Sequence, residues 1–205
     1  MRPIPFPSGT QMVGDDGWVS NDFLQWFTYL QMVSASYLNT STFTQTASVT
    51  VGNTVTETSL FGAGQGSLTL PINALTTGKR VRWTLMGVIT DTGTPTLNIR
   101  IKVGGATIAS TGAVALVGTV VNRAFRIQFE LTCRSIGASG TVIGQGSFWY
   151  DNSTNLGTTE GIAMTATATV DTTAQLTLDA SAQWGTADPA DTLTVTNATV
   201  EVFGG

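Results

Sequence analysis

Apolar and polar side chains alternate in short runs along most of the chain, and turn-forming residues separate the runs. The clearest runs are residues 79–90, 96–103 and 124–134. A period of two residues is typical of a β-strand that buries one face, because successive side chains point to opposite sides of the strand. The positions expected to face inward are Val81, Trp83, Leu85, Gly87, Ile89, Leu97, Ile99, Ile101, Val103, Phe125, Ile127, Phe129, Leu131 and Cys133.

Residues 59–205 hold about eight such runs, most of them followed by turn residues such as Gly, Asp, Asn and Pro. Many short strands with alternating faces predict two antiparallel sheets around one core. We therefore expect an all-β fold, a jelly-roll-like antiparallel sandwich, over residues 59–205. No segment recurs with a period of roughly 20–50 residues, which argues against a solenoid or a propeller.

Residues 39–58 also alternate, with Phe43, Val49 and Val51 among the apolar positions and Thr or Ser between them. The pattern predicts a strand, a turn at Gly52 and Asn53, and a second short strand. Because this segment is only weakly apolar, we expect it to be a β linker or stalk rather than part of the core.

Residues 20–38 differ from the rest, because bulky apolar side chains recur there at alternating spacings of three and four. This spacing predicts an amphipathic helix about 27 Å long, which Ser20 or Asn21 can cap. A lone helix of this length is marginal in water and must bury its apolar face. The residues expected to form this oligomerisation or docking face are Phe23, Trp26, Phe27, Leu30, Val33 and Tyr37.

The aromatic face of the helix has three candidate partners. Large rings at the seam fit a wider core than that of a two-helix coiled coil, which favours three copies and therefore a homotrimer. The alternatives are packing on the chain's own β-domain and docking into another protein. Residues 1–19 form an arm that is expected to be extended and to become ordered only against a partner. Its anchoring residues are expected to be Pro3, Pro5, Phe6 and Pro7.

Composition then limits the classes of function. Charged residues make up 11% of the chain and the net charge is −4, so the basic excess of a nucleic-acid-binding protein is missing. The chain has no His and a single Cys, Cys133, so we expect no metal site, no cofactor and no enzymatic activity. The N-terminus lacks the apolar region of a signal peptide, and no apolar run is long enough to span a bilayer. We expect synthesis in a cytoplasm and no membrane insertion.

Most basic residues fall on the polar faces of three predicted strands. If these strands were neighbours in one sheet, their side chains would form a basic strip. The strip could be a solvated face, a contact with carboxylates of another subunit, or a surface for an anionic glycan. The candidate subunit-interface charges are Arg80, Arg82, Arg100 and Lys102, accompanied by Arg126 and Arg134.

Three aromatic residues near strand ends are candidates for ligand binding. Trp149 and Tyr150 precede the sequence Asp-Asn, and Trp184 precedes a turn that contains Asp188. Aromatic faces beside Asp and Asn are typical of sugar-binding surfaces, whereas the alternative is that these rings close the ends of the sandwich. No pair of carboxylates marks a glycosidase site. The loops Asp-Asn-Ser-Thr-Asn and Asp-Pro-Ala-Asp are candidates for binding calcium, but neither matches the EF-hand pattern.

Three stretches of the chain resemble a β-domain that recurs in structural proteins of tailed bacteriophages. They are KRVRWTLMGVITDTGTPTLNIRIKVGGATIASTGAVAL, CRSIGASGTVIGQGSFWYD and VDTTAQLTLDASAQWGTADPADTLTVTNATVEV, which together cover much of residues 59–203. The N-terminal arm that ends in DGWVSNDFLQWFTYL also resembles the start of phage fibre or spike proteins. The motifs are turn and strand motifs, and the resemblance supplies no catalytic residues.

The resemblance implies a component of the virion, made in the bacterial host: a head fibre, a spike, a decoration protein or a tail-fibre knob. Such proteins are commonly trimers with an N-terminal attachment segment and a C-terminal β-knob. We therefore expect a non-enzymatic structural protein that contacts itself and other capsid or tail proteins, and that can bind host surface glycans. The alternatives are a receptor-binding tip of a tail fibre and, less favoured, a carbohydrate-active enzyme or a lectin.

Overall fold

The computed structural model describes residues 41–152 and 157–204, and every helix or strand assigned within them is a strand. The arm predicted at residues 1–19 and the helix predicted at residues 20–38 lie outside the described residues. The strands are β1 (Ser41–Gln45), β2 (Val49–Gly52), β3 (Thr58–Ser59), β4 (Gly64–Gly66), β5 (Thr69–Leu70), β6 (Arg80–Asp91), β7 (Thr96–Val103), β8 (Ala106–Ser110), β9 (Val114–Ala115), β10 (Val120–Ser135), β11 (Gly140–Tyr150), β12 (Thr158–Ala163), β13 (Ala168–Val170), β14 (Leu176–Trp184) and β15 (Thr192–Phe203).

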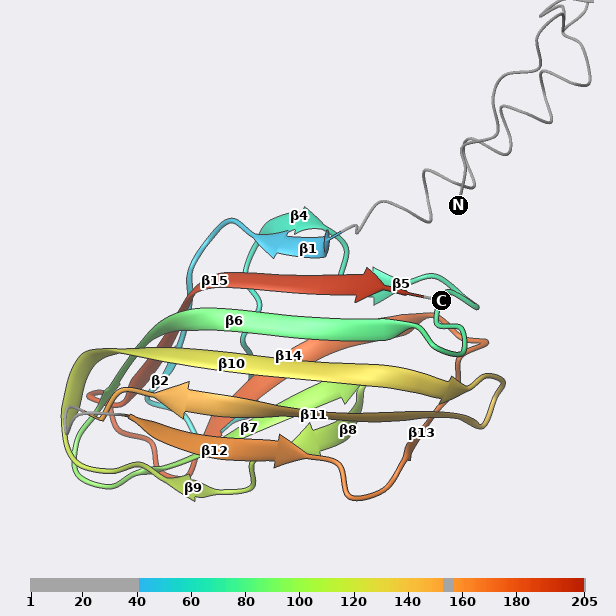
Figure 1. The fold of residues 1–205 in the computed structure, drawn as a ribbon. Coiled ribbons are helices and arrows are strands. Elements are labelled where there is room, and N and C mark those ends of the chain that lie inside the picture. Colours follow the sequence, from blue (N-terminus) through green and yellow to red (C-terminus); the bar gives the residue numbers. More distant parts are fainter. Residues whose placement is uncertain (1–40, 153–156, 205) are drawn as a thin grey trace, which may run out of the picture. The chain divides into compact units, whose positions relative to one another are not determined.

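These strands form two sheets, and every strand pair in them is antiparallel. The larger sheet runs in the order β12-β11-β10-β6-β15-β1-β4, with β13 beside β11 and β2 beside β15. The smaller sheet runs β3-β14-β7-β8, with β5 beside β14 and β9 beside β7. Figure 1 shows the larger sheet in front of the smaller one. The predicted all-β antiparallel fold is confirmed, while the jelly-roll order stays a prediction.

One core lies between the sheets, and the predicted alternation accounts for most of it. Apart from Gly87, every position expected inward from the three clearest runs is buried, including Trp83, Ile101 and Cys133. Some aromatic rings pack edge to face in this core, as for Trp83 and Phe129, whose ring centroids are 5.9 Å apart. Such pairs add about 0.5–1.5 kcal/mol each to the stabilisation from burial alone.

Glycine leaves room for this packing on the inner face of β11. Gly144 lies opposite Leu131, and Gly146 lies opposite Phe129. A Cβ atom on Gly144 would stand 2.8 Å from the Leu131 Cα and 2.9 Å from the Phe129 ring, closer than side chains approach. A Cβ atom on Gly146 would collide with the backbone of Gln128 and Phe129. The strands therefore need bare backbone at these two positions.

The expectation of a separate linker over residues 39–58 is wrong. β1 pairs with β15 and β4, and β2 pairs with β15, so this part of the chain belongs to the larger sheet. Phe43 is only 5% exposed and Val51 only 2%. The compact unit accordingly begins at residue 40 rather than 59. A few large side chains are enough to anchor β1 and β2 in the sheet, because their partner strand, β15, helps to bury them.

Candidate functional site

The outward side chains of the larger sheet form rows that cross neighbouring strands. In one row, Arg126 of β10 lies opposite Trp149 of β11 on one side and Met86 of β6 on the other. The next row places Gln128 opposite Ser147. In both rows β10 is the central strand, because its 16 residues pair with β6 and β11 along most of their length.

The first row lies in a groove of about 530 Å³ on this outer face. The ring of Trp149 is partly exposed there, Arg126 is exposed, and Met86 is 42% exposed. We call this the apolar groove; its side chains come from Met86, Val88, Ala124, Arg126, Trp149 and Thr196.

A second groove of about 710 Å³ continues along β10 and β11. We call it the polar groove; its side chains include Gln128, Glu130, Thr132, Arg134, Gln145 and Ser147. The grooves adjoin, because Gln128 and Ser147 stand two residues from Arg126 and Trp149 on the same strands and the same face. From Trp149 to Ile143 the two grooves extend over about 20 Å at 3.4 Å per residue.

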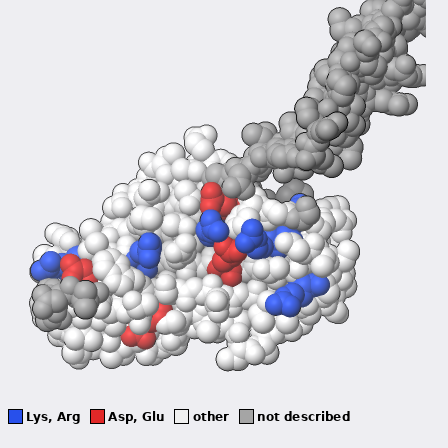
Figure 2. Space-filling view, in the orientation of Figure 1, with Lys and Arg blue, Asp and Glu red and all other residues white. Residues whose placement is uncertain are grey.

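Charge on this face is sparse and largely paired. Figure 2 shows a mostly uncharged surface with a few small groups of Lys, Arg, Asp and Glu. Arg82 donates two hydrogen bonds to Oε2 of Glu130, at 3.0 and 2.8 Å from Nε and Nη2, and Arg80 donates to Oε1 at 3.1 Å. The Arg80 guanidinium also lies 4.3 Å above the centre of the Phe203 ring. These contacts hold Glu130 in place at the edge of the polar groove.

The guanidinium groups of Arg126 and Arg134 differ from the paired groups of Arg80 and Arg82. No ion pair found among the described residues includes Arg126 or Arg134. Arg126 lies in the apolar groove and Arg134 in the polar groove. Each therefore keeps several N–H donors available to a ligand that carries hydroxyl or carboxylate oxygens.

The three aromatic residues predicted to bind ligand have different positions. Trp149 lies on the outer face, but Tyr150 is 0% exposed and Trp184 is 1% exposed. The Tyr150 hydroxyl accepts a hydrogen bond from the Val117 amide at 2.9 Å. The Trp184 indole donates to the Val51 carbonyl oxygen at 3.1 Å. Tyr150 and Trp184 are therefore core residues, and their prediction as surface binding residues is wrong.

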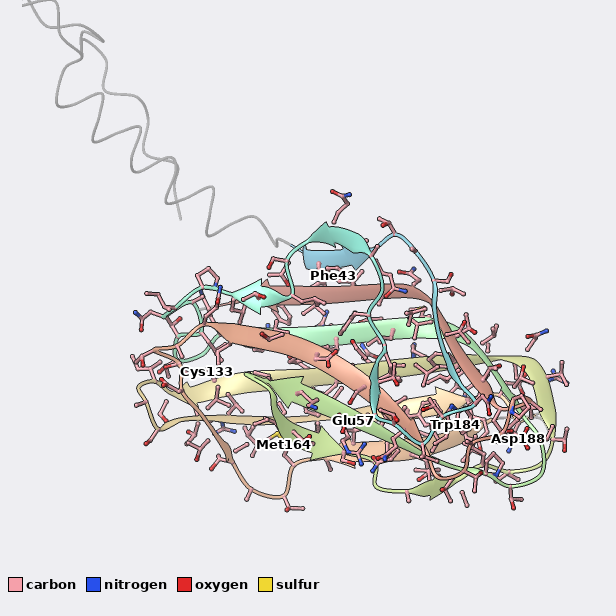
Figure 3. The ribbon with its side chains drawn as sticks, turned by 180° about the vertical axis from the view of Figure 1, so that it is seen from behind. Phe43, Glu57, Cys133, Met164, Trp184 and Asp188 are labelled. Atoms are coloured by element: carbon pink, nitrogen blue, oxygen red, sulfur yellow. The ribbon has the colours of Figure 1, made fainter. Side chains whose placement is uncertain are left out.

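The predicted basic strip is divided between the two sheets. Arg80 and Arg82 lie on β6, whereas Arg100 and Lys102 lie on β7 of the smaller sheet. On β7, Lys102 contacts Glu57 at 2.8 Å and Arg100 contacts it at 3.4 Å. Figure 3 labels Glu57 on this side of the molecule. All four predicted interface charges thus have carboxylate partners in their own chain, and no second subunit is needed to pair them.

Glu57 is the centre of this second charged group. Its Oε1 accepts hydrogen bonds from Lys102 at 2.8 Å and from Ser181 at 2.6 Å. These hydrogen bonds hold the pKa of Glu57 below its ordinary value of 4.5, and the charges of Lys102 and Arg100 act in the same direction. The segment before β3 is thereby fixed on the outer face of the smaller sheet.

Sequence reasoning missed several residues of the grooves. The sequence patterns do not mark Met86, Gln128 or Gln145 as candidates, and they mark Arg126 only as part of the basic strip. Their positions in the alternating pattern could have indicated them, because each occupies an outward position on a strand whose alternate residues face the core. Met86 gains meaning only with its neighbours, because it adds to one apolar surface together with Val88 and Trp149.

Comparison with known proteins adds little to this geometry. No family model and no curated protein matches the chain. Among solved structures, the CBM2 module of the evolved Dit protein from Lactobacillus casei BL23 phage J-1 is similar, with 14% sequence identity and a TM-score of 0.29. The match covers 65% of this chain and 66% of that one, just under two thirds of its length. A TM-score of this size does not identify a shared fold.

Two further structural findings concern only the described residues. Within residues 41–152 and 157–204, no helix is long and apolar enough to cross a membrane. In the same ranges, no group of three or more His, Cys, Asp or Glu side chains is placed to hold a metal ion.

Proposed function

We propose that the β-domain is the glycan-binding knob of a non-enzymatic structural protein in the virion of a tailed phage. The observation that carries the proposal is the pairing of the two grooves on one face, with Trp149 and Arg126 in the first and a row of polar side chains in the second. The resemblance of residues 59–203 to phage structural β-domains supports the setting of this face in a virion.

The chemistry of the grooves suits a sugar chain. A sugar ring offers C–H groups on one face and hydroxyls around its rim. The partly exposed indole of Trp149 can cover the apolar face of one ring, because aromatic side chains combine a large contact area with little conformational freedom to lose. The guanidinium of Arg126 and the amides of Gln128 and Gln145 can then bond the hydroxyls.

The shape of the grooves favours an extended ligand over a small one. Both are open, and they adjoin along the strands over about 20 Å. A small metabolite is bound more typically in an enclosed pocket that buries most of its surface. An oligosaccharide with successive rings along β10 and β11 fits this geometry better. Weak binding at each site, multiplied by several copies of the knob, would give firm attachment to a cell surface.

Attachment to the particle belongs to the part of the chain outside the described residues. We propose that residues 20–38 form the three-helix junction of a homotrimer and that residues 1–19 bind another virion protein. The spacing of Phe23, Trp26, Leu30, Val33 and Tyr37 supports this arrangement. Light scattering of the full chain tests it: wild type should have the mass of three chains, whereas Leu30→Asp should have the mass of one. A Leu30→Asp variant that remains trimeric would exclude the helix as the junction.

A glycan array tests the binding function. The full-length protein should bind a defined set of bacterial surface glycans, and Trp149→Ala should lose that binding. Ile72→Ala is the matched control, because Ile72 is a large apolar side chain that is 63% exposed and lies outside both grooves. It should bind like wild type. Equal binding by all three proteins, or binding by none, would contradict the proposal. Immunogold labelling of virions then distinguishes a head fibre from a tail-fibre tip.

A further inference from the structure

Two aspartates meet at one end of the sandwich, away from both grooves. β6 ends at Asp91, and β15 begins directly after Asp191. Thr90 pairs with Thr192 in the antiparallel ladder, so Asp91 and Asp191 face each other one step beyond that pair. Both continue the inward-facing rows of their strands, which hold Ile89 and Leu193. Two carboxylates are thus placed together at the edge of the core.

The carboxylate of Asp91 is completely buried and has no partner. The residue is 0% exposed, and neither Oδ1 nor Oδ2 receives a hydrogen bond. The backbone amide of Val120 is near enough to influence the carboxylate, but it does not reach hydrogen-bond geometry. No Lys or Arg within the described residues forms an ion pair with Asp91 or Asp191.

Asp191 is almost as buried, at 2% exposure, and one of its oxygens is held by the neighbouring loop. Its Oδ1 accepts hydrogen bonds from the amide of Thr92 at 2.9 Å and from the Thr92 hydroxyl at 3.3 Å. The turn before it is fixed as well, because the Asp191 amide donates to the Asp188 carbonyl oxygen at 3.1 Å. Figure 3 labels Asp188 at this end of the molecule. The Asp191 carboxylate is therefore held in place beside Asp91.

Such a pair is costly unless something compensates it. Buried carboxylates are normally paired with a cation, bonded to donors or bound to a metal, and like charges facing each other across a ladder destabilise it. Burial, with the nearby charge of Asp191, raises the pKa of Asp91 to about 6. Two buried carboxylates that face each other, one of them without any hydrogen-bond donor, form a site that a bound cation would compensate.

We propose that Asp91 and Asp191 together bind one calcium ion at this end of the sandwich. Oxygen ligands without His or Cys select a hard cation. Calcium accepts irregular sets of six to eight oxygens that include backbone carbonyls, whereas magnesium requires a regular octahedron and usually keeps several waters. Because only two carboxylates are present, the remaining ligands would have to be backbone carbonyl oxygens and water. The ion would link the end of β6 to the start of β15, and neither carboxylate lines a groove where a glycan could reach it.

Thermal unfolding of the full chain, freed of metal with a chelator, tests the proposal. Calcium at about 100 times its Kd should raise the Tm by roughly 5–10 °C for a domain of this size. Asp91→Asn and Asp191→Asn should each lose most of this shift, because Asn keeps the shape and removes the charge. Asp171→Asn is the matched control, since Asp171 lies in an exposed turn before β14, and it should keep the full shift.

Calorimetric titration of the metal-free wild type gives an independent reading that needs no variant. It should show one calcium ion bound per chain, with magnesium binding much more weakly. The proposal is overturned if wild type shows neither calcium binding nor a shift in Tm. A wild type that ignores calcium but is stabilised by mild acid would also overturn it, because the two carboxylates would then share a proton. If calcium raised the Tm of wild type and of Asp91→Asn equally, the proposal would also be overturned, because the ion would then be bound elsewhere.

Discussion

Trp184 offers a prediction that separates a structural role from a binding role. Its side chain is 1% exposed, and its indole Nε1 donates to the Val51 carbonyl oxygen at 3.1 Å. Trp184 belongs to β14 of the smaller sheet and Val51 to β2 of the larger sheet. This hydrogen bond therefore joins the two sheets directly. Removing it should weaken the sandwich and leave the outer face of the larger sheet unchanged.

The substitution Trp184→Phe removes the indole N–H and one ring of the side chain. The Val51 carbonyl then loses its donor in a buried site, which costs about 1–3 kcal/mol. The smaller ring leaves a gap that the neighbouring side chains only partly fill, at a further cost of about 1 kcal/mol or more. We expect the free energy of unfolding to fall by roughly 2–4 kcal/mol, which lowers the Tm by at least about 4 °C in a domain of this size.

Urea unfolding followed by far-UV circular dichroism measures this loss. Trp149→Phe serves as the matched control, because it makes the same chemical change on the outer face and should cost less than about 1 kcal/mol. Glycan binding by folded Trp184→Phe should equal that of wild type. The reasoning is refuted if Trp184→Phe unfolds at the wild-type urea concentration and instead loses glycan binding, since the side chain would then be a binding residue.

Two further predictions concern the inner face of β11 and the smaller sheet. Gly146→Ala should lower the free energy of unfolding by about 3 kcal/mol or more, because its Cβ would collide with the Gln128 and Phe129 backbone; Gly161→Ala, where the added Cβ has open space, should be neutral or slightly stabilising in the same urea experiment. For Glu57, a folded-state pKa below 4.5 means that its stabilising contribution is present above that pH and is lost as the pH falls through the folded pKa. The stability difference between wild type and Glu57→Gln should therefore shrink from about pH 6 to about pH 3, and a constant difference would show that the ion pairs do not stabilise the fold.

The pattern of alternating side chains predicted the central strands well, because each buries one complete face. β6, β7 and β10 have their expected inward rows, from Val81 through Cys133. The same parity held information about the aromatic residues: Tyr150 is in phase with buried Phe148, and Trp184 is in phase with Ala180 and Ala182. Following the phase to the end of each strand would have placed both rings in the core.

Pairings between distant segments could not be predicted. β1 and β15 are neighbours in the sheet, yet Phe43 and its partner Val200 are more than 150 residues apart in the chain. Nothing local in residues 39–58 distinguishes a strand that is completed by β15 from a free ribbon. The split of the basic residues has the same origin, because the polar faces of β6 and β7 look alike in sequence and only the topology assigns them to different sheets.

Only part of the candidate site could be predicted from the sequence, because the site joins residues from different strands. Trp149 could be proposed from its place beside Asp and Asn, but its neighbours in the groove come from other strands. Arg126 and Met86 are brought to it by the registers of β10 with β11 and β6. The pairing of the two aspartates could not be predicted from the sequence either, because Asp91 and Asp191 are 100 positions apart.

The most direct test of the glycan-binding face is calorimetric titration of the best glycan from the array against wild type, Trp149→Phe and Trp149→Ala in the full chain. If the ring of Trp149 covers a sugar, Trp149→Ala should weaken binding at least about tenfold, equivalent to about 1.4 kcal/mol. Trp149→Phe should keep most of the affinity, because it retains an aromatic face at the same position. Wild-type affinity in Trp149→Ala would contradict binding at this face.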